Sequence, residues 1–304
     1  GEAGEFITIE HKHVRPVPQT DIQVFDELDT NVIMLEVFPG MQHSSVLRNI
    51  LQDKELRGVV LKSYGAGNIP TDADFLGLFK SFVDRGGIVV NVTSVPEGEV
   101  VMGLYETSQV LLDRGIIGGF DLTPEAAMCK LMMLLGHYGE DVNTVKRLMQ
   151  KSIAGEQSMN AETTSFSGPG ECVAGGVAQL PRQQLASIED ESRIQRVMLR
   201  FKSATVDPGS AETVSIRLTL EGGPEIGLFR RGRVPEHALV KDESVGESLT
   251  LDLTSHREQF VNKATERSRA LQASQRLGFR IQLEGADGAR FAWSDVELNV
   301  YYRD

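Results

Sequence analysis

The stretch Val59-Val60-Leu61-Lys62-Ser63-Tyr64-Gly65-Ala66-Gly67-Asn68-Ile69-Pro70 decides the fold of the first half of the chain. Its apolar beginning is typical of a strand buried on both faces, and the glycines, asparagine and proline that follow are typical of a turn before a helix. Loops at the carboxyl ends of parallel strands line the crevice where α/β proteins bind ligands. The spacing alone fits two interpretations, a ligand-contacting loop and an ordinary strand-to-helix turn.

Short apolar runs alternate with amphipathic runs on both sides of this stretch. The apolar runs predict strands at residues 32–38, 58–63 and 88–93, and a brief fourth strand or a turn at residues 116–119. Apolar residues at helical spacing predict helices at residues 44–56, 72–84, 105–114, 126–135 and 142–149. Strands that alternate with helices predict a small parallel-sheet α/β domain with right-handed crossovers, which we place at residues 31–155.

The pattern changes after residue 155. Residues 156–192 are polar, contain glycine breakers and lack periodicity, so we expect a linker there. Residues 193–304 contain runs that alternate apolar and polar residues, which predicts an antiparallel β-sandwich or jelly roll: 197–201, 214–220, 249–253, 279–283 and 296–300. Phe291 and Trp293 fit either a core or a surface that stacks on a sugar ring. The predicted fold class is therefore α/β followed by all-β, and the role of the β domain stays open.

Composition and charge narrow the possible partners. The chain has 304 residues and a formal net charge of −12, which argues against a nucleic-acid backbone or an anionic membrane as the main partner. No apolar run approaches the roughly 20 residues that a membrane helix needs. The first residues lack the basic and apolar regions of a signal peptide, so we expect a cytoplasmic protein.

The cysteines and histidines point to no metal site. We expect Cys129, among apolar helix residues, to lie in the core, and Cys172, which follows Gly-Pro-Gly, to be more exposed. Two free thiols and a single disulfide both fit the sequence. His11 and His13 have no carboxylate or cysteine placed to complete a metal site. We therefore predict neither a metal nor a cofactor.

Motifs in a fixed order give the first half of the chain a resemblance to a known family. They are Val37-Phe38-Pro39-Gly40, the stretch from Gly58 to Pro70, Arg85-Gly86-Gly87-Ile88-Val89-Val90-Asn91-Val92-Thr93, Gly103-Leu104-Tyr105-Glu106 and Gly118-Gly119-Phe120-Asp121-Leu122-Thr123-Pro124-Glu125-Ala126-Ala127. Together they resemble the C-terminal domain of the L-asparaginase family, in particular its type I, cytoplasmic branch. Residues 1–30 resemble the end of that family's N-terminal domain and the following inter-domain linker. The resemblance implies hydrolysis of a side-chain amide, that of asparagine or of glutamine.

Two motifs with which this family performs catalysis do not occur in the 304 residues. One is Thr-Gly-Gly-Thr, which supplies a threonine nucleophile, and the other is Gly-Thr-Asp-Thr, whose threonine works with the aspartate and a lysine. A hydroxyl nucleophile is weak at neutral pH and needs a positioned partner. The resemblance therefore implies no catalytic residue in this chain, no activity of the chain alone, and an N-terminal catalytic domain as partner, in the same or a separate chain.

The resemblance also implies binding residues. In the family, the C-terminal domain forms much of the subunit interface, and its loops face the active site of a neighbouring subunit, which implies a homo-oligomer that binds L-asparagine. Tyr64, Asn68, Tyr105 and Glu106 match these loops and are candidates for substrate or inter-subunit contacts. Asn68 would offer an amide and Glu106 a carboxylate to the substrate's amino group.

A second group of candidates matches an allosteric asparagine site of the bacterial cytoplasmic branch. That site uses an arginine before Ser-Tyr-Gly and a Thr-Gln-Cys after the third strand. Here the matching positions are Lys62 and Thr93-Ser94-Val95, so Lys62, Thr93 and Ser94 are the allosteric candidates. The sequence departs from the family at Lys62, because lysine lacks the planar fork with which arginine clamps a carboxylate.

Two functions fit these observations. The chain is the C-terminal part of an asparaginase-like amidohydrolase, or it is a non-catalytic oligomerisation or regulatory module whose β domain binds a partner. A third hypothesis is an asparaginase-related subunit that delivers ammonia to a charged transfer RNA, and the acidic charge balance does not favour it.

Overall fold

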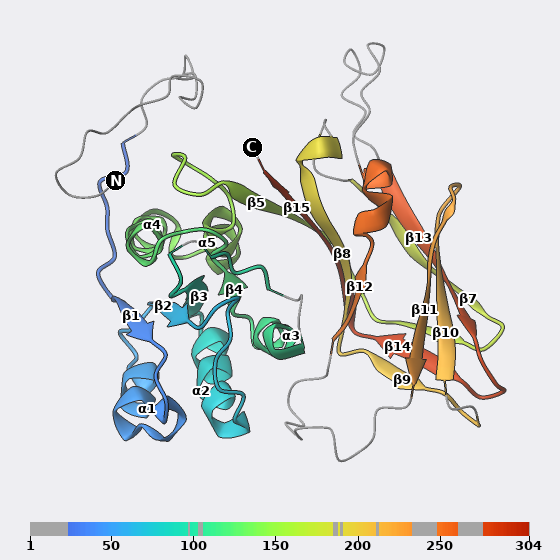
Figure 1. The fold of residues 1–304 in the computed structure, drawn as a ribbon, viewed down its shortest axis with the longest axis horizontal. Coiled ribbons are helices and arrows are strands. Elements are labelled where there is room, and N and C mark those ends of the chain that lie inside the picture. The colour runs from blue at the N-terminus through green and yellow to red at the C-terminus, as the bar shows by residue number, and fades with distance from the viewer. Residues whose placement is uncertain are drawn as a thin grey trace, which may run out of the picture.

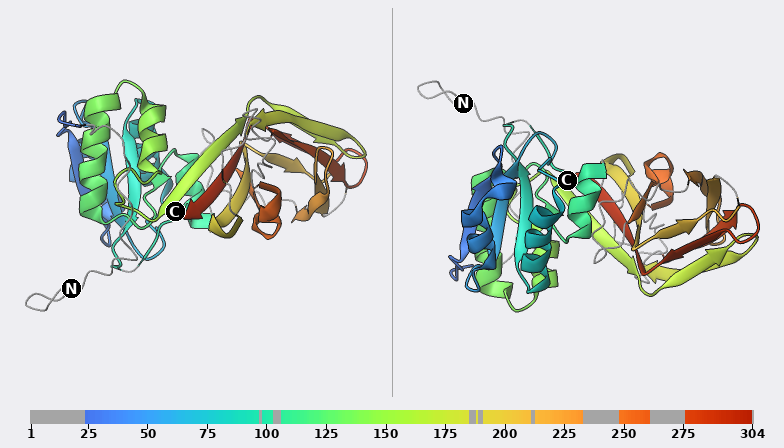
Figure 2. Two further views of the ribbon diagram at one scale, coloured as in Figure 1. Left: turned by 90° about the horizontal axis from the view of Figure 1, so that it is seen from above. Right: turned by 90° about the horizontal axis from the view of Figure 1, so that it is seen from below.

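The computed structural model describes residues 24–303 except 97, 103–105, 185–187, 189–190, 211–212, 233–247 and 261–275. The described chain forms an α/β domain followed by an antiparallel β domain, and the two lie side by side (Figures 1 and 2). This confirms the predicted order of α/β and all-β parts. Within the described residues, no helix has both the length and the apolar character needed to cross a membrane.

A four-stranded parallel sheet is the centre of the α/β domain. Its order is β1 (Val32–Glu36), β2 (Gly58–Ser63), β3 (Ile88–Thr93) and β4 (Ile117–Gly118). Side chains alternate between the two faces, so Val59 and Leu61 join one apolar core while Val60 joins the other. Burial on both faces explains why β2 and β3 are almost uninterrupted apolar runs.

Helices cover both faces of this sheet (Figure 1). One core contains apolar residues of α1 (Ser45–Gln52), α2 (Ala73–Asp84) and α3 (Glu106–Asp113), and the other contains those of α4 (Pro124–Tyr138) and α5 (Val142–Met149). Side-chain caps begin four of these helices by accepting a hydrogen bond from the amide three residues later. The capping residues are Ser44, Asp72, Thr123 and Asp141.

The β domain has three antiparallel sheets. The first has the order β11 (Glu225–Gly232), β10 (Thr213–Leu220), β13 (Arg276–Glu284), β7 (Val177–Gln184). The second has the order β12 (Leu249–Asp252), β8 (Ile194–Lys202), β15 (Asp295–Arg303), β5 (Met159–Phe166), and the third β6 (Gly170–Val173), β14 (Arg290–Trp293), β9 (Thr205–Asp207). Their inward residues share one apolar core.

The aromatic residues of β14 belong to this core. The Trp293 side chain is only 5% exposed, and its ring lies 5.0 Å from that of Phe291 and 5.3 Å from that of Phe201. Phe291 and Trp293 are therefore core residues, not a surface that stacks on a sugar ring. Short 3₁₀ segments at Met41–His43, Glu191–Arg193 and Thr254–Phe260 complete the described elements.

The predicted linker at residues 156–192 differs from the structure, because β5, β6 and β7 lie within it and belong to the antiparallel sheets. β5 and β7 are edge strands, and each shows several exposed positions. Leu180 is the buried residue of β7. β7 buries little surface and therefore needs few apolar residues, so its sequence lacked the alternation that identified the inner strands.

The predicted environments of the two cysteines are also wrong. Cys129 is exposed and Cys172 is buried, and both are free thiols. On α4 the buried residues include Ala127 and Leu131, and Cys129 lies midway between them in sequence, on the opposite face of the helix. Cys172 lies on β6 opposite Phe291, where the strand passes over the core of the β domain.

An apolar contact joins the two domains. Phe120 and Val101 of the α/β domain form a buried cluster with Met159, Met198 and Tyr301 of the β domain. The Phe120 and Tyr301 rings lie edge to face with their centroids 6.0 Å apart. Such pairs contribute about 0.5–1.5 kcal/mol beyond the burial of their area.

Polar contacts also cross between the domains, and several end on α3. Arg200 of β8 forms an ion pair with Asp113 (Nη2–Oδ1 2.5 Å), with both side chains more than nine-tenths buried. The Thr250 hydroxyl donates to the Gln109 amide oxygen at 2.6 Å, and the Ser248 hydroxyl donates to Asp113 at 2.6 Å. The β domain therefore holds α3 in place from its C-terminal half.

Candidate functional site

The loop at residues 64–70 leaves the carboxyl end of β2 and turns tightly back on itself. The Tyr64 amide donates to the Asn68 carbonyl at 3.1 Å, and the Asn68 amide donates to the Tyr64 carbonyl at 2.9 Å. Gly65 and Gly67 take φ values of 51° and 106°, in the left-handed region that favours glycine. A Cβ at Gly67 would lie 2.8 Å from a methyl carbon of Val100, so only glycine fits there without displacement.

Side chains of the neighbouring strand β3 hold this loop. The Asn91 amide donates to the Gly67 carbonyl at 2.9 Å, and the Thr93 hydroxyl donates to the Gly65 carbonyl at 2.7 Å. Asn91 is fully buried and Thr93 is 5% exposed, so water does not compete with these bonds. The loop therefore has one fixed conformation set by β3.

The role of Asn91 in holding the loop was not predicted from the sequence. A polar residue inside the apolar run of β3 was the available signal, because a buried amide needs partners and here finds one in the loop. Its Oδ1 atom has no hydrogen-bond partner in the described part of the chain.

The loop presents Tyr64 and Asn68 to the outside. Both residues are exposed, with Tyr64 at 45%, whereas Ile69 is 8% exposed and packs into the core beside α2. Ile69 thus anchors the end of the loop while the two candidate side chains stand on its outer surface. An exposed phenol and an amide on a fixed loop are suited to contact a ligand or a second protein surface.

Of the other two predicted contact residues, the structure places only the backbone of Glu106, at the start of α3. Tyr105 is outside the described residues, and of Glu106 the structure describes the backbone as the first residue of α3. The segment that leads to them passes beside the loop, since Val100 lies against Gly67 and the Met102 sulfur is 3.7 Å from the Asn91 amide nitrogen. Val100 and Met102 thus lie beside the loop, and α3 begins four residues after Met102.

The three allosteric candidates occupy the ends of β2 and β3. Lys62 Nζ lies 3.3 Å from a carboxylate oxygen of Glu36, on the neighbouring strand β1. Thr93 supports the loop, and the Ser94 amide donates to the Ser63 carbonyl at 2.8 Å. In these contacts the three residues bind groups of the protein itself, so their role as an allosteric site stays a prediction.

This edge of the sheet offers hydrogen-bonding groups rather than a nucleophile with its base. The Ser63 and Thr93 hydroxyls both donate to backbone carbonyls, which leaves neither activated for attack on an amide. Among the residues that the structure describes, no group of three metal-ligating side chains occurs. His11 and His13 lie outside the described residues. The geometry therefore fits a surface that contacts a substrate or a subunit.

The chain is similar to known proteins over part of its length. Residues 31–149 match the Glutaminase/Asparaginase C-terminal domain. The chain is 30% identical over 239 residues to the human 60 kDa lysophospholipase, which covers 77% of this chain and 40% of that protein. It is 37% identical over 123 residues to L-asparaginase 1 of Escherichia coli (strain K12), covering 40% of this chain and 36% of that protein.

A solved structure, that of L-asparaginase I from Vibrio cholerae, is 35% identical with a TM-score of 0.43 and covers 46% of this chain and 42% of that chain. The chain thus spans 40% and 36% of the lengths of the two curated relatives described above. All three comparisons involve part of each protein, and the family match lies within the α/β domain.

Proposed function

We propose, from the match of residues 31–149 to the Glutaminase/Asparaginase C-terminal domain, that the chain is the C-terminal part of an L-asparaginase-like amidohydrolase. The reaction is hydrolysis of L-asparagine to aspartate and ammonia. The threonine nucleophile comes from an N-terminal catalytic domain, in the same or a separate chain, because neither of the family's nucleophile motifs occurs in these 304 residues. The β domain, which we propose to be a β-sandwich, is an accessory to this unit.

The fixed loop at residues 64–70 is the observation that carries the proposal. Catalysis gains most from groups that are held in position before the substrate arrives, and hydrogen bonds from Asn91 and Thr93 hold this loop. Tyr64 and Asn68 then need no reordering to contact a substrate or the domain that binds it. Under this proposal Tyr105 and Glu106 also contact the substrate or the neighbouring subunit.

We also propose that the protein is a cytoplasmic homo-oligomer. Exposed apolar side chains on and near edge strand β1 support the oligomer, namely Met34 (39% exposed), Phe38 (52%) and Val46 (65%). Apolar residues that gather at one edge of a domain are typical of a surface that another protein covers. Phe38 follows β1 at the same carboxyl edge as the loop.

The test is release of ammonia from asparagine and from glutamine. The chain is assayed alone, and then mixed with a separately produced asparaginase N-terminal domain that carries the threonine nucleophile. We expect no release by the chain alone and release by the mixture. Size-exclusion chromatography of the same mixture reports association, and an associated but silent mixture would refute the proposal.

The second candidate function is a regulatory or oligomerisation module. The ion pair and hydrogen bonds between the β domain and α3 favour it. Arg200, Ser248 and Thr250 bind the C-terminal half of the helix whose first residue is the candidate Glu106. A movement of the β domain would therefore reach the candidate contact surface. An associated mixture without activity, in which the chain nevertheless forms a stable oligomer, would select this function.

A further inference from the structure

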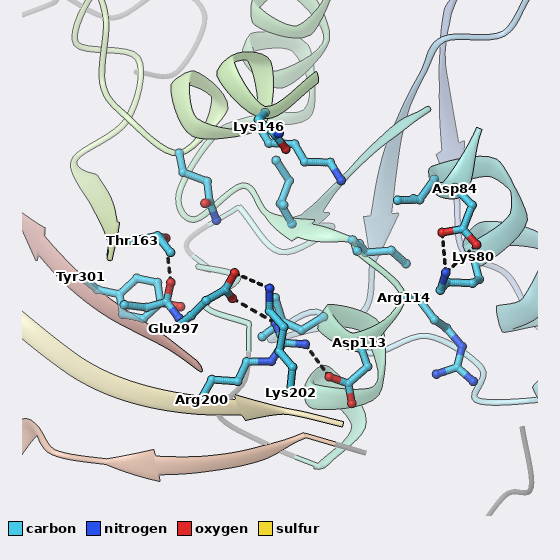
Figure 3. A pocket seen from close by; sticks show the side chains of 18 residues that line it. Lys80, Asp84, Asp113, Arg114, Lys146, Thr163, Arg200, Lys202, Glu297 and Tyr301 are labelled. Carbon is cyan, nitrogen blue, oxygen red and sulfur yellow. Dashed lines mark hydrogen bonds and ion pairs between the residues drawn. The ribbon is translucent and has the colours of Figure 1, made fainter. Parts of the chain in front are cut away.

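A cavity of about 410 Å³ lies between the two domains, away from the loop at residues 64–70. Its walls come from α2, α3, the turn into β4 and α5 on one side, and from β5, β8 and β15 on the other (Figure 3). Pockets that bind small molecules commonly have volumes of about 300–1,000 Å³ and lie between domains. The cavity therefore has the size and the place of a small-molecule site.

The lining of the cavity is basic, although the protein as a whole carries a net charge of −12. Five cationic side chains face three carboxylates. The cations are Lys80, Arg114, Lys146, Arg200 and Lys202, and the carboxylates are Asp84, Asp113 and Glu297. A local excess of positive charge inside an acidic protein attracts anions.

The three carboxylates already have cationic partners. Lys80 binds Asp84, Arg200 binds Asp113, and Glu297 binds both Lys202 and Arg200 (Figure 3). These pairs leave two cations, Arg114 and Lys146. Arg114 donates a hydrogen bond to the Val110 carbonyl at 3.1 Å, whereas the ammonium of Lys146 on α5 makes no hydrogen bond or ion pair within the described part of the chain. Figure 3 shows its side chain pointing into the space bordered by Arg114 and by the Arg200–Glu297–Lys202 group.

The position of Lys146 is unfavourable for a charge without a bound anion. Burial lowers the pKa of the ammonium, the charges of Lys202 and Lys80 lower it further, and only Asp84 opposes them. The nitrogen lies 3.7 Å from the point where a Cβ on Gly115 would stand, so it rests against the turn into β4. Lys146 is half-buried, and a cation that is partly withdrawn from water without a partner is unfavourable.

Neutral polar groups of the lining also lack side-chain partners in the described structure. No hydrogen bond joins the side chains of Asn143, Gln150 or Tyr301 to another described residue, although all three line the cavity. Tyr301 is only 6% exposed, and the Nε atom of Arg200 is buried without an acceptor. Amide, hydroxyl and guanidinium groups can all donate hydrogen bonds. The three carboxylates of the lining are already paired with cations, so an anion in the cavity would be a further acceptor for these donors.

We propose that this cavity binds a small molecule that carries at least two negative charges on phosphate or carboxylate groups. Such an anion would accept hydrogen bonds from Lys146, Asn143 and Gln150 and from the buried Tyr301 and Arg200. A neutral or cationic ligand would leave Lys146 unpaired. Because the lining comes from both domains, a bound anion stabilises their contact and with it the folded chain.

Isothermal titration calorimetry of the full chain tests the site, with inorganic phosphate, pyrophosphate and citrate as probes at constant ionic strength in chloride. Two variants remove or oppose the positive charge, Lys146→Gln and Asn143→Asp. Asn143 is exposed in the first turn of α5, where an acidic residue favours the helix, so Asn143→Asp is expected to fold normally. Lys54→Gln is the matched control, because Lys54 is an exposed lysine that does not line the cavity.

We expect at least one of the three anions to bind, and both cavity variants to weaken that binding by about tenfold or more, or about 1.4 kcal/mol. The Lys54→Gln control keeps the affinity of the unchanged protein. Preference for phosphate or pyrophosphate over citrate, or the reverse, identifies which of the two acidic groups the ligand carries. The proposal is overturned if none of the anions binds, or if an anion binds Lys146→Gln and Asn143→Asp as tightly as the unchanged chain.

Discussion

Replacement of Lys130 by methionine is expected to destabilise the protein by about 3 kcal/mol. Lys130 is 5% exposed on α4, and its ammonium binds the Met149 carbonyl (3.3 Å), the Gln157 amide oxygen (2.9 Å) and the Glu156 carboxylate (2.6 Å). It also donates to the Lys151 carbonyl. One partner, Met149, is the last residue of α5, and the other three lie between α5 and β5, so Lys130 holds that connection against α4.

The magnitude follows from what methionine leaves behind. Methionine fills the space of the lysine stem but leaves three carbonyl oxygens without the lysine donor and the Glu156 carboxylate without its cation, although the Ile153 and Ala154 amides still donate to that carboxylate. Loss of one partner from a buried ion pair costs about 3–5 kcal/mol. The Glu156 side chain is 18% exposed and water reaches it in part, which favours the lower end of that range.

Urea unfolding and differential scanning calorimetry measure the effect. A loss of about 3 kcal/mol corresponds to a decrease in melting temperature of roughly 6–12 °C for a protein of this size. Lys54→Met, at an exposed lysine, is the control and is expected to change stability by less than about 0.5 kcal/mol. If Lys130→Met is as stable as the control, the reasoning about this buried lysine is wrong.

Three further outcomes are expected. Burial raises the pKa of Glu156, but hydrogen bonds from Lys130 and from backbone amides, together with the charge of Lys130, outweigh that effect and lower the pKa. The contribution of Glu156 to stability is therefore present above about pH 4.5 and is lost as the pH falls through the lowered pKa. Glu156→Gln should flatten the acid limb of a curve of stability against pH. Asp113→Ala leaves Arg200 without its closest partner and is expected to cost about 3–5 kcal/mol in denaturant unfolding, whereas an unchanged midpoint would show that this pair does not hold the domains together. Gly67→Ala forces a Cβ against Val100 at a left-handed φ and is expected to lower stability by about 1–3 kcal/mol, a result that a wild-type unfolding curve would contradict.

The strands and helices of the α/β domain were predictable because each follows from local sequence, either an apolar run or a capping residue. β2 and β3 are buried on both faces and read as apolar runs, and α2 begins at a capping Asp72 as its sequence indicates. The predicted boundaries at residues 72–84 differ from α2 (Ala73–Asp84) only at the cap. Local spacing and capping chemistry are enough in such cases.

Features that depend on distant partners were not predictable. Nothing near Arg200 in the sequence indicates that it binds Asp113, 87 positions away, and Asn91 gains its role only when the loop closes over β3. The edge strand β5 exposes Thr163 and Ser165 and therefore resembles a polar linker. The predicted contact residues Tyr64 and Asn68 were found on the outer surface of the loop, and their function stays a proposal.

The most direct test of the proposed function is ammonia release from L-asparagine while this chain is titrated into a fixed amount of asparaginase N-terminal domain. Analytical ultracentrifugation of each mixture gives the fraction associated. We expect activity to rise from zero in proportion to that fraction and to saturate when all of the N-terminal domain is bound. Activity that stays at zero while the associated fraction approaches one would contradict the account.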